Sequence, residues 1–330
     1  MIQGSTGTPK PKTMRAAVLA APGRAELREV ALPEPGPAQV RVRLEGCGVC
    51  GSNLPVWEGR DWFRYPLAPG APGHEGWGRV DAVGSGVAGV REGDRVAALF
   101  GGAFAEYDVS DAAALLRLPP ALDALPFPGE PLACGVNVFR KAQIRAGDVV
   151  AVVGLGFIGA VAARMAALAG ARVIAFGRRT WALDLARALG ASDTVALGER
   201  SRDVARVREL TGGRMCDVAI EAVGLQEPLD LAAELLREQG RLVIAGFHQD
   251  GRRSVDLCSW NWKGFDIVNA HFRDPAVTVE GMRVAADAVA SGRLDVSALV
   301  THRFGLERLG DAFEAMRTRP DGFLKGVVVP

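Results

Sequence analysis

Short hydrophobic runs separated by turn residues fill the first third of the chain. Runs at 15–19, 39–44, 78–83 and 94–99 are rich in valine, leucine and alanine, and glycine and proline separate them. Runs of this kind are typical of β-strands joined by turns. From residue 14 to about residue 118 the pattern therefore predicts a small barrel or sandwich of strands.

Near residue 131 the pattern changes to fully apolar strands that alternate with helices. Strands without polar alternation are buried on both faces, and their alternation with helices is typical of a doubly wound parallel sheet. The expected strands are 148–153, 171–176, 217–223, 240–246 and a closing strand at 325–329. The expected helices are an alanine-rich segment that ends at 170, followed by 181–189, 228–237, 277–290 and 306–316.

A chain of 330 residues exceeds what one hydrophobic core usually supports, so we expect two domains. The predicted fold class is α/β, with a Rossmann-type parallel sheet beside a mainly-β domain. Residues 1–13 are polar and are expected to be a disordered leader, with Met14 as a natural start. The expected boundaries are 14–135 for the mainly-β domain, 136–268 for the domain with the parallel sheet, and 269–330 for a tail that returns to the first domain.

Composition excludes several function classes. The 39 basic and 38 acidic side chains give a net charge of +1, so there is no electrostatic case for binding nucleic acid or an anionic membrane. No apolar run approaches the ~18 residues that a membrane helix needs. Five thinly spread cysteines and the lack of an apolar signal segment argue against a disulfide framework and predict a reducing, cytoplasmic location.

A glycine motif at 154–159, GLGFIG, lies between an expected strand and an expected helix. In this context the first glycine makes a tight turn, the second lets the backbone approach a pyrophosphate, and the third allows close helix–strand packing. An ordinary glycine-rich turn is the alternative. The candidate cofactor-binding positions are Gly154, Gly156, Phe157, Ile158, Gly159, Arg178, Arg179, Val223, Gly246 and Lys325.

The end of the second strand of this unit bears on which dinucleotide is bound. Sites selective for NAD usually place a carboxylate there, whereas this chain has Arg178 and Arg179 and no acid before Asp184. Guanidinium groups bind a 2′-phosphate through charge-assisted hydrogen bonds. The sequence therefore favours NADP(H) over NAD(H), although both arginines are also compatible with a solvated helix start.

Two upstream segments carry metal-binding side chains: GCGVCGSN at 46–53 and PGHEGWG at 72–78. The Cys47–Cys50 pair is also compatible with a redox pair or half of a structural zinc site, but the chain has no second C-x-x-C. Together with the glycine motif, in this order, the segments resemble the zinc-dependent alcohol/polyol dehydrogenases of the medium-chain dehydrogenase/reductase superfamily. The resemblance extends from Met14 to Pro330 and implies a GroES-like catalytic domain followed by a Rossmann domain.

The resemblance implies one catalytic Zn²⁺ per chain, with Cys50 as thiolate ligand and His74 as imidazole ligand. Glu75 and Glu130 compete as the third ligand, and Cys134 ranks well below both. Such a set with an open fourth position suits a catalytic zinc, which acts as a Lewis acid on an alcohol or carbonyl oxygen. Ser52 resembles the first group of the family's proton relay.

Three departures from the family pattern qualify this expectation. Asn53 stands where the family usually has the aspartate partner of the zinc-bound imidazole, and its amide oxygen can still accept the ring N–H. Pro55 stands where many polyol dehydrogenases have a histidine, so the outer proton relay is absent or rerouted. The cysteine-rich lobe that holds a structural zinc in many relatives is reduced to a short glycine-rich link.

The expected activity is hydride transfer between NADP(H) and a secondary alcohol or ketone that is polyol-like, sugar-like or an amino alcohol. Trp57, Phe100, Asn137 and the stretch 269–273 are candidates to line the substrate pocket, and the resemblance implies a homodimer or homotetramer. Two alternatives remain at this point. One is a zinc-free NADPH-dependent enone or quinone reductase, and the other is a non-catalytic NADP-binding sensor.

Overall fold

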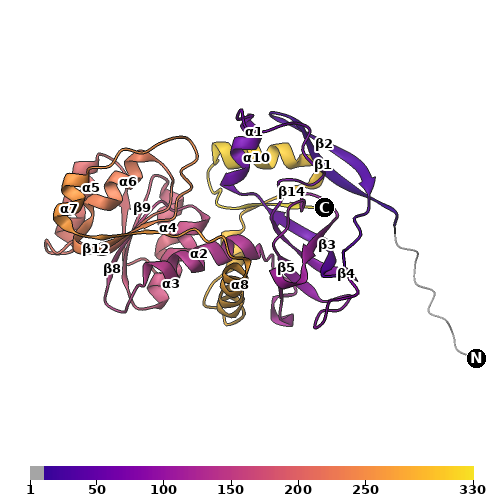
Figure 1. Ribbon diagram of the computed structural model, residues 1–330. Helices are drawn as coiled ribbons and strands as arrows, with labels where there is room; N and C mark the ends of the chain where they lie inside the picture. The colour runs from indigo at the N-terminus through magenta and orange to yellow at the C-terminus, as the bar shows by residue number, and fades with distance from the viewer. Residues whose placement is uncertain (1–10) are drawn as a thin grey trace, which may run out of the picture. The chain divides into compact units, whose positions relative to one another are not determined.

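The computed structural model describes residues 11–330, which divide into two compact units. The first unit holds the described residues up to Arg117, together with Arg303–Phe313 and Val327–Pro330 (Figure 1). The second unit holds Leu118–His302 and Glu314–Gly326. The C-terminal segment is therefore shared between the units. Of the expected leader, residues 1–10 lie outside the described residues, and Thr13 is the first residue of a strand.

A six-stranded parallel sheet forms the centre of the second unit, in the order β10-β9-β8-β11-β12-β13. This order is the 3-2-1-4-5-6 arrangement of dinucleotide-binding folds, in which the direction of winding reverses between the strands here labelled β8 and β11. The expected doubly wound sheet is confirmed. Its strands are β8 (Val149–Val153), β9 (Arg172–Gly177), β10 (Asp193–Ala196), β11 (Cys216–Glu221), β12 (Leu236–Ile244) and β13 (Asp266–Asn269).

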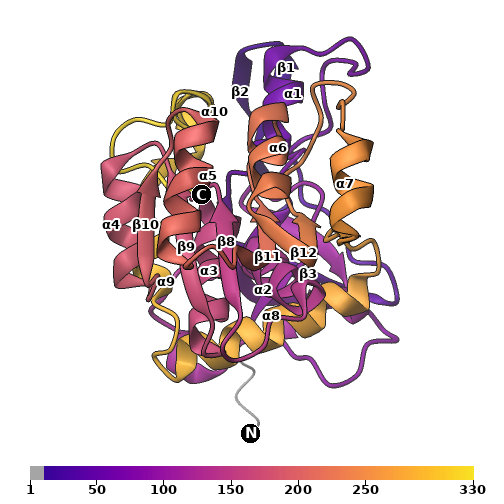
Figure 2. The same cartoon turned by 90° about the vertical axis from the view of Figure 1, so that its left-hand side faces the viewer.

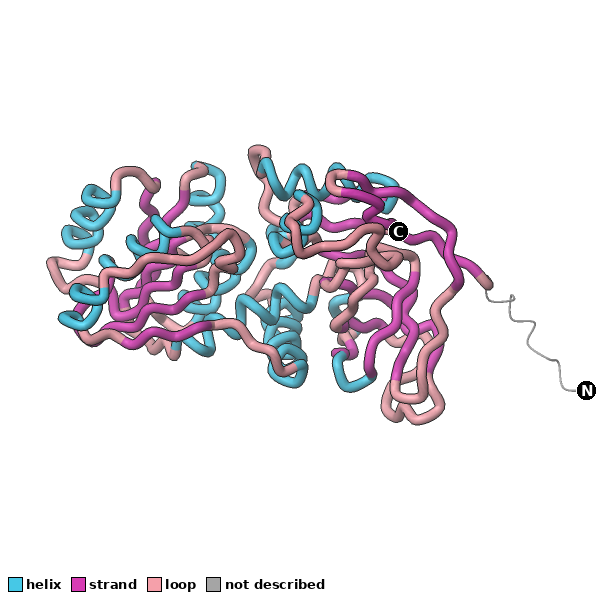
Figure 3. Tube along the Cα trace, turned by 45° about the horizontal axis from the view of Figure 1, so that its top comes forward, coloured by secondary structure: helices cyan, strands magenta, loops and turns pink. Residues whose placement is uncertain are grey.

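Helices cover both faces of this sheet (Figures 2 and 3). Alternate residues of β8 point to opposite faces: Val150 and Val152 pack in one apolar cluster with α2 and α3, and Val149 and Val153 pack in another with α5 and α6. Among the described residues, no helix is both long and apolar enough to cross a bilayer. The helices of this unit are α2 (Gly129–Ala142), α3 (Phe157–Leu168), α4 (Thr180–Ala188), α5 (Arg200–Leu210), α6 (Gln226–Glu234), α7 (Leu257–Lys263), α8 (Pro275–Ala290) and α9 (Val296–Leu299).

The first unit is built on an antiparallel sheet in the order β14-β15-β3-β4-β5-β7, with β6 paired to β3 and a separate hairpin of β1 and β2. The expected mainly-β domain is confirmed. Its strands are β1 (Thr13–Ala21), β2 (Arg24–Ala31), β3 (Gln39–Gly48), β4 (Glu75–Val83), β5 (Arg95–Ala98), β6 (Tyr107–Asp111), β7 (Leu115–Arg117), β14 (His302–Gly305) and β15 (Gly326–Val329). Helix α1 (Leu54–Glu58) follows β3, and α10 (Leu309–Thr318) spans the division between the units.

Several elements differ from the sequence expectation. Helix α1 interrupts a region expected to hold only strands and turns, and Pro55 lies in its first turn, where proline is well tolerated. Helices α2 and α5 were not expected. Helix α6 ends at Glu234 rather than near residue 237, because Leu235 and Leu236 are buried and Leu236 already pairs with Cys216 of β11.

Candidate metal and nucleotide sites

Cys50, His74 and Glu75 form a cluster of potential metal ligands in the first unit. One ligand atom from each side chain lies within 4.8 Å of the others, and the described residues contain no second group of this kind. Cys50 and His74 are half-buried, whereas Glu75 is fully buried. A thiolate, an imidazole and a carboxylate at this spacing fit the ligand set of a catalytic zinc. The structure therefore brings Glu75 together with Cys50 and His74, the two ligands that the resemblance implies.

The pairing of β3 with β4 places the Glu75 carboxylate. Glu75 begins β4 and lies opposite Gly48, the last residue of β3. A Cβ atom at Gly48 would lie only 1.9 Å from Glu75 Oε2, so the Glu75 carboxylate occupies the space that a side chain at Gly48 would need. Cys50 follows two residues later on the same chain segment. Antiparallel register therefore brings the two sequence motifs together.

A backbone carbonyl fixes the imidazole of His74. Its Nδ1 lies 2.9 Å from the carbonyl oxygen of Pro72. Because a carbonyl only accepts hydrogen bonds, Nδ1 carries the ring proton and Nε2 carries the lone pair that a metal ion requires. A hydrogen bond of this kind is a usual feature of histidine ligands.

Asn53 has a different role from the expected one. Its Oδ1 accepts the backbone N–H of Cys50 at 2.9 Å, and its Nδ2 donates to the Pro72 carbonyl at 3.3 Å. The expectation that the amide oxygen accepts the His74 ring N–H was wrong, because the imidazole bonds to Pro72. Asn53 is only 1% exposed and thus connects the Cys50 segment to the carbonyl that orients His74.

Glu130, the competing third ligand, belongs to the second unit. It lies in the first turn of α2, and its Oε1 accepts a hydrogen bond from Cys134 Sγ at 3.2 Å. Helical spacing of four residues accounts for this pair. Ser52 lies half-buried in the short 3₁₀ turn Gly51–Asn53.

The other cysteines divide into buried and exposed side chains. Cys47 is 1% exposed and Cys216 is fully buried, and burial raises the pKa of the Cys216 thiol to about 12. Both therefore behave as small apolar residues. Cys258 is exposed.

The glycine motif forms the turn from β8 into α3. Gly154 has φ +107°, and a Cβ atom there would lie 2.4 Å from Val223 Cγ2, so only glycine fits. Gly159 packs α3 against the turn, because a Cβ atom there would lie 2.0 Å from the Gly154 carbonyl oxygen. A Cβ atom at Gly156 would meet no atom within 4 Å. This open space in front of the N-terminus of α3 fits a bound pyrophosphate.

Other candidate positions gather at the same edge of the sheet. Lys325 is 3% exposed, and its Nζ lies 4.9 Å from the centre of the Phe157 ring, at the first turn of α3. Val223 follows β11 and contacts the Gly154 turn, and Gly246 follows β12. The carboxyl ends of parallel strands at such a switch point are where this fold binds its ligand.

The two arginines after β9 have different environments. Arg179 Nη1 donates to the Phe323 carbonyl at 2.5 Å, and its guanidinium lies 5.8 Å from the Trp181 ring. Arg178 is exposed, and within the described residues it makes no hydrogen bond or ion pair. Arg319 is exposed to solvent, and partial desolvation by its neighbours, followed by the positive charges of Arg179 and Arg178, lowers its pKa. Arg319 is thus a third arginine of this cluster, which sequence reasoning missed because it is 140 positions (319 − 179) from Arg179.

Three of the expected pocket residues lie in packed interiors of their own units. Trp57 is 6% exposed, with its ring 5.2 Å from that of Phe313. Phe100 is 8% exposed and packs beside Gly76. Asn137 is 3% exposed and donates to the Val277 carbonyl of α8 at 3.2 Å. All three side chains are buried within their units, and their place in a substrate pocket stays a prediction.

Comparison with known proteins points to one family. The profile of the alcohol dehydrogenase GroES-like domain matches residues 36–120, and that of the zinc-binding dehydrogenases matches residues 158–287. The chain is 31% identical to an alcohol dehydrogenase of Cupriavidus necator, over 96% of this chain and 99% of that protein. It is 30% identical to the sorbitol dehydrogenase of Gallus gallus, over 89% and 91% of the two chains.

Solved structures agree with this result. The alcohol dehydrogenase TADH of Thermus sp. ATN1 superimposes with a TM-score of 0.81 at 28% identity, over 96% of this chain and 99% of that one. A protein of Sinorhizobium meliloti 1021 assigned as a zinc-binding dehydrogenase, and bound to NADP, superimposes with a TM-score of 0.84 at 27% identity, over 97% and 100% of the chains. The chain therefore belongs to the zinc-binding dehydrogenases of the medium-chain dehydrogenase/reductase superfamily, which act on alcohols and polyols with a nicotinamide cofactor.

Proposed function

We propose that this chain transfers a hydride between NADP(H) and a secondary alcohol or ketone with several polar groups, at one zinc ion held by Cys50, His74 and Glu75. The observation that carries the proposal is the convergence of these three ligand atoms within 4.8 Å. Similarity to a sorbitol dehydrogenase favours a polyol-like, sugar-like or amino-alcohol substrate. We further propose reduction of the ketone as the physiological direction, and a cytoplasmic location remains a prediction.

In this proposal each residue of the site has a separate role in metal binding, orientation, proton transfer or cofactor binding. The three ligands would hold a Zn²⁺ ion, which supplies Lewis acidity towards the substrate oxygen. The Pro72 carbonyl keeps the His74 ring in the required tautomer, and Asn53 holds both loops in place. Ser52 would accept the substrate's hydroxyl proton in the oxidation and pass it outward, and a bound nicotinamide would accept the carbon-bound hydride. Lys325 and the N-terminus of α3 attract the pyrophosphate.

The test of this function is a screen of polyols, amino alcohols and their ketones with NADP(H) and NAD(H), alongside zinc analysis of the purified protein. We expect about one zinc per chain, and we expect Cys50→Ala and His74→Ala to lose both zinc and turnover. Turnover of enones or quinones by protein with less than about 0.2 zinc per chain would instead support the zinc-free reductase. Dinucleotide binding without turnover of any substrate would support a sensor.

The preference for NADP(H) rests on the three arginines near the end of β9. The positive charges of Arg179 and Arg178 act unfavourably on Arg319, so a 2′-phosphate bound beside these arginines would gain charge-assisted hydrogen bonds and offset that repulsion. We expect Arg178→Ala and Arg319→Ala each to raise the Kd for NADPH by about tenfold and to leave that for NADH nearly unchanged. Fluorescence titration measures both constants.

Arg317→Ala is the matched control for this prediction. Arg317 lies two residues before Arg319 and already pairs with Glu314, at 2.6 Å. We expect its loss to change neither Kd. If the Arg178 and Arg319 variants weakened NADH and NADPH equally, the arginines would not select the phosphate.

We also propose a homo-oligomer, formed by a second copy along β13. This strand is the outermost of the six-stranded sheet, and Ile267 on it is 50% exposed. An exposed strand edge with apolar side chains is suited to pairing with another chain. Light scattering that gave the mass of a single chain would contradict this proposal.

A further inference from the structure

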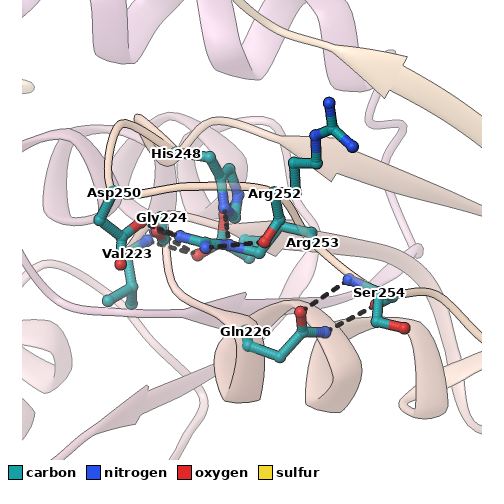
Figure 4. Close-up of polar contacts among 9 residues, drawn as sticks. Val223, Gly224, Gln226, His248, Asp250, Arg252, Arg253 and Ser254 are labelled. Atoms are coloured by element: carbon teal, nitrogen blue, oxygen red, sulfur yellow. Dashed lines mark hydrogen bonds and ion pairs between the residues drawn. The ribbon is translucent and has the colours of Figure 1, made fainter.

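A buried chain of hydrogen bonds joins the ends of β11 and β12, apart from the metal ligands and the glycine motif. Glu221, the last residue of β11, is fully buried. Its Oε1 accepts the backbone N–H groups of Val223 and Gly224, both at 2.7 Å, and its Oε2 lies 3.0 Å from His248 Nε2. Figure 4 shows His248 above Gly224 and Val223, with Arg253 beside them. A buried carboxylate with three donors is held firmly.

The position of the proton on His248 follows from its second partner. Arg253 Nε donates to His248 Nδ1 at 2.9 Å. A guanidinium only donates, so Nδ1 accepts and the ring proton lies on Nε2, directed at Glu221. Arg253 Nη2 also donates to the Gly224 carbonyl at 2.7 Å and pairs with Asp250. His248 is therefore a neutral link of fixed orientation between a carboxylate and a guanidinium.

These bonds close the loop after β12 onto the end of β11. The Gln226 side chain exchanges two hydrogen bonds with the main chain of Ser254, at 2.8 and 3.0 Å, visible in Figure 4. The approach is so close that a Cβ atom at Gly246 would lie 2.5 Å from Glu221 Oε2 and 2.1 Å from the Gly224 nitrogen. These hydrogen bonds hold the segments 221–226 and 246–254 together, and we call the two segments the braced edge.

The location of the braced edge in the sheet relates it to one half of a bound dinucleotide. A dinucleotide-binding sheet has two halves, each of which receives one mononucleotide. The glycine turn and Arg178 belong to the β8-β9-β10 half, which would take the adenosine end. The braced edge belongs to the β11-β12-β13 half, and Val223 on it touches the Gly154 turn.

We propose that Glu221, His248 and Arg253 are positioning residues for the nicotinamide half of the cofactor. They fix the backbone at Val223 and Gly246, against which the nicotinamide riboside lies, and make no contact with the reacting atoms themselves. This inference rests on the proposed function, because it requires that a dinucleotide binds at this edge.

The test compares the whole cofactor with a fragment that lacks nicotinamide. In His248→Ala we expect the Kd for NADPH to rise by about tenfold, and the Kd for 2′-phospho-ADP-ribose to stay within about twofold of wild type. NADH and ADP-ribose serve as a parallel pair. His248→Gln keeps an N–H donor towards Glu221 and carries an amide oxygen, displaced from the imidazole Nδ1 position, as acceptor for Arg253, so a smaller selective loss is expected. Isothermal titration measures all four constants.

Arg252→Ala is the control within the same loop. Arg252 is exposed, and its side chain makes no bond with other described residues, so we expect wild-type affinity for every ligand. Unchanged NADPH binding in His248→Ala, or an equal loss for NADPH and the fragment, would overturn the inference. If His248→Ala did not fold, His248→Gln would decide the matter by the same comparison. A wild-type protein that bound neither ligand would refute the proposed function instead.

Discussion

Gly156→Ala is expected to abolish dinucleotide binding and to leave the folded protein intact. A methyl group at this position would occupy the open space in front of the N-terminus of α3, where the backbone must approach the pyrophosphate. We expect the Kd for NADPH to rise by about a hundredfold or more. The backbone of Gly156, at φ −83° and ψ −175°, suits alanine, so the free energy of unfolding should stay within about 1 kcal/mol of wild type.

Two other glycine variants separate binding from stability. Gly159→Ala places its Cβ atom 2.0 Å from the Gly154 carbonyl oxygen, so α3 must move away from the turn. We expect the free energy of unfolding to fall by about 2 kcal/mol and the affinity for NADPH to fall as well. Gly101→Ala, in the first unit, meets no atom within 4 Å and should change neither quantity. NADPH titration and urea unfolding measure the two effects. Wild-type affinity in Gly156→Ala would place the pyrophosphate elsewhere.

The sequence predicted best where one local pattern determines one local structure. The short apolar run of β8 is followed directly by the glycine motif and then by an alanine-rich segment, so the strand, the turn and the start of α3 were all anticipated. Helix α5 was missed because its sequence, Arg200–Leu210, is mostly polar and buries few residues, among them Asp203 and Val207. Such a helix carries little periodic signal.

The candidate site was predicted as a set of residues but not as an arrangement. Cys50 and His74 lie in recognisable motifs. The partner of the His74 ring is the Pro72 carbonyl, a backbone group that every residue has, so only the bend of the chain determines that contact. His248 has no ligand-like spacing, and its role emerges only when β11 and β12 lie side by side. Arg319 needed the C-terminal segment to return to β9. In each case the missing information was a contact between distant parts of the chain.

Glu75 and Glu130 are the two candidates for the third zinc ligand, and their glutamine variants are expected to differ in zinc content. We expect Glu75→Gln to lose most of its bound zinc, because an amide replaces the one carboxylate grouped with Cys50 and His74. Glu130→Gln should keep about one zinc per chain, since its carboxylate is bonded to Cys134 within α2. Zinc content after dialysis, and affinity by competition with a chelator, measure the difference. Loss of zinc in Glu130→Gln together with retention in Glu75→Gln would reverse the assignment.

Gly48→Ala tests the same assignment without removing a ligand. Its Cβ atom would lie 1.9 Å from Glu75 Oε2, so the carboxylate must leave its position, and we expect zinc affinity to fall by about 10- to 100-fold. Gly51→Ala is the matched control, because it lies beside Cys50 in the same segment and its Cβ atom would meet nothing within 4 Å. Equal zinc affinity in the two alanine variants would show that the position of the Glu75 carboxylate does not matter to the metal. A selective loss in Gly48→Ala would connect the strand register of β3 and β4 directly to metal binding.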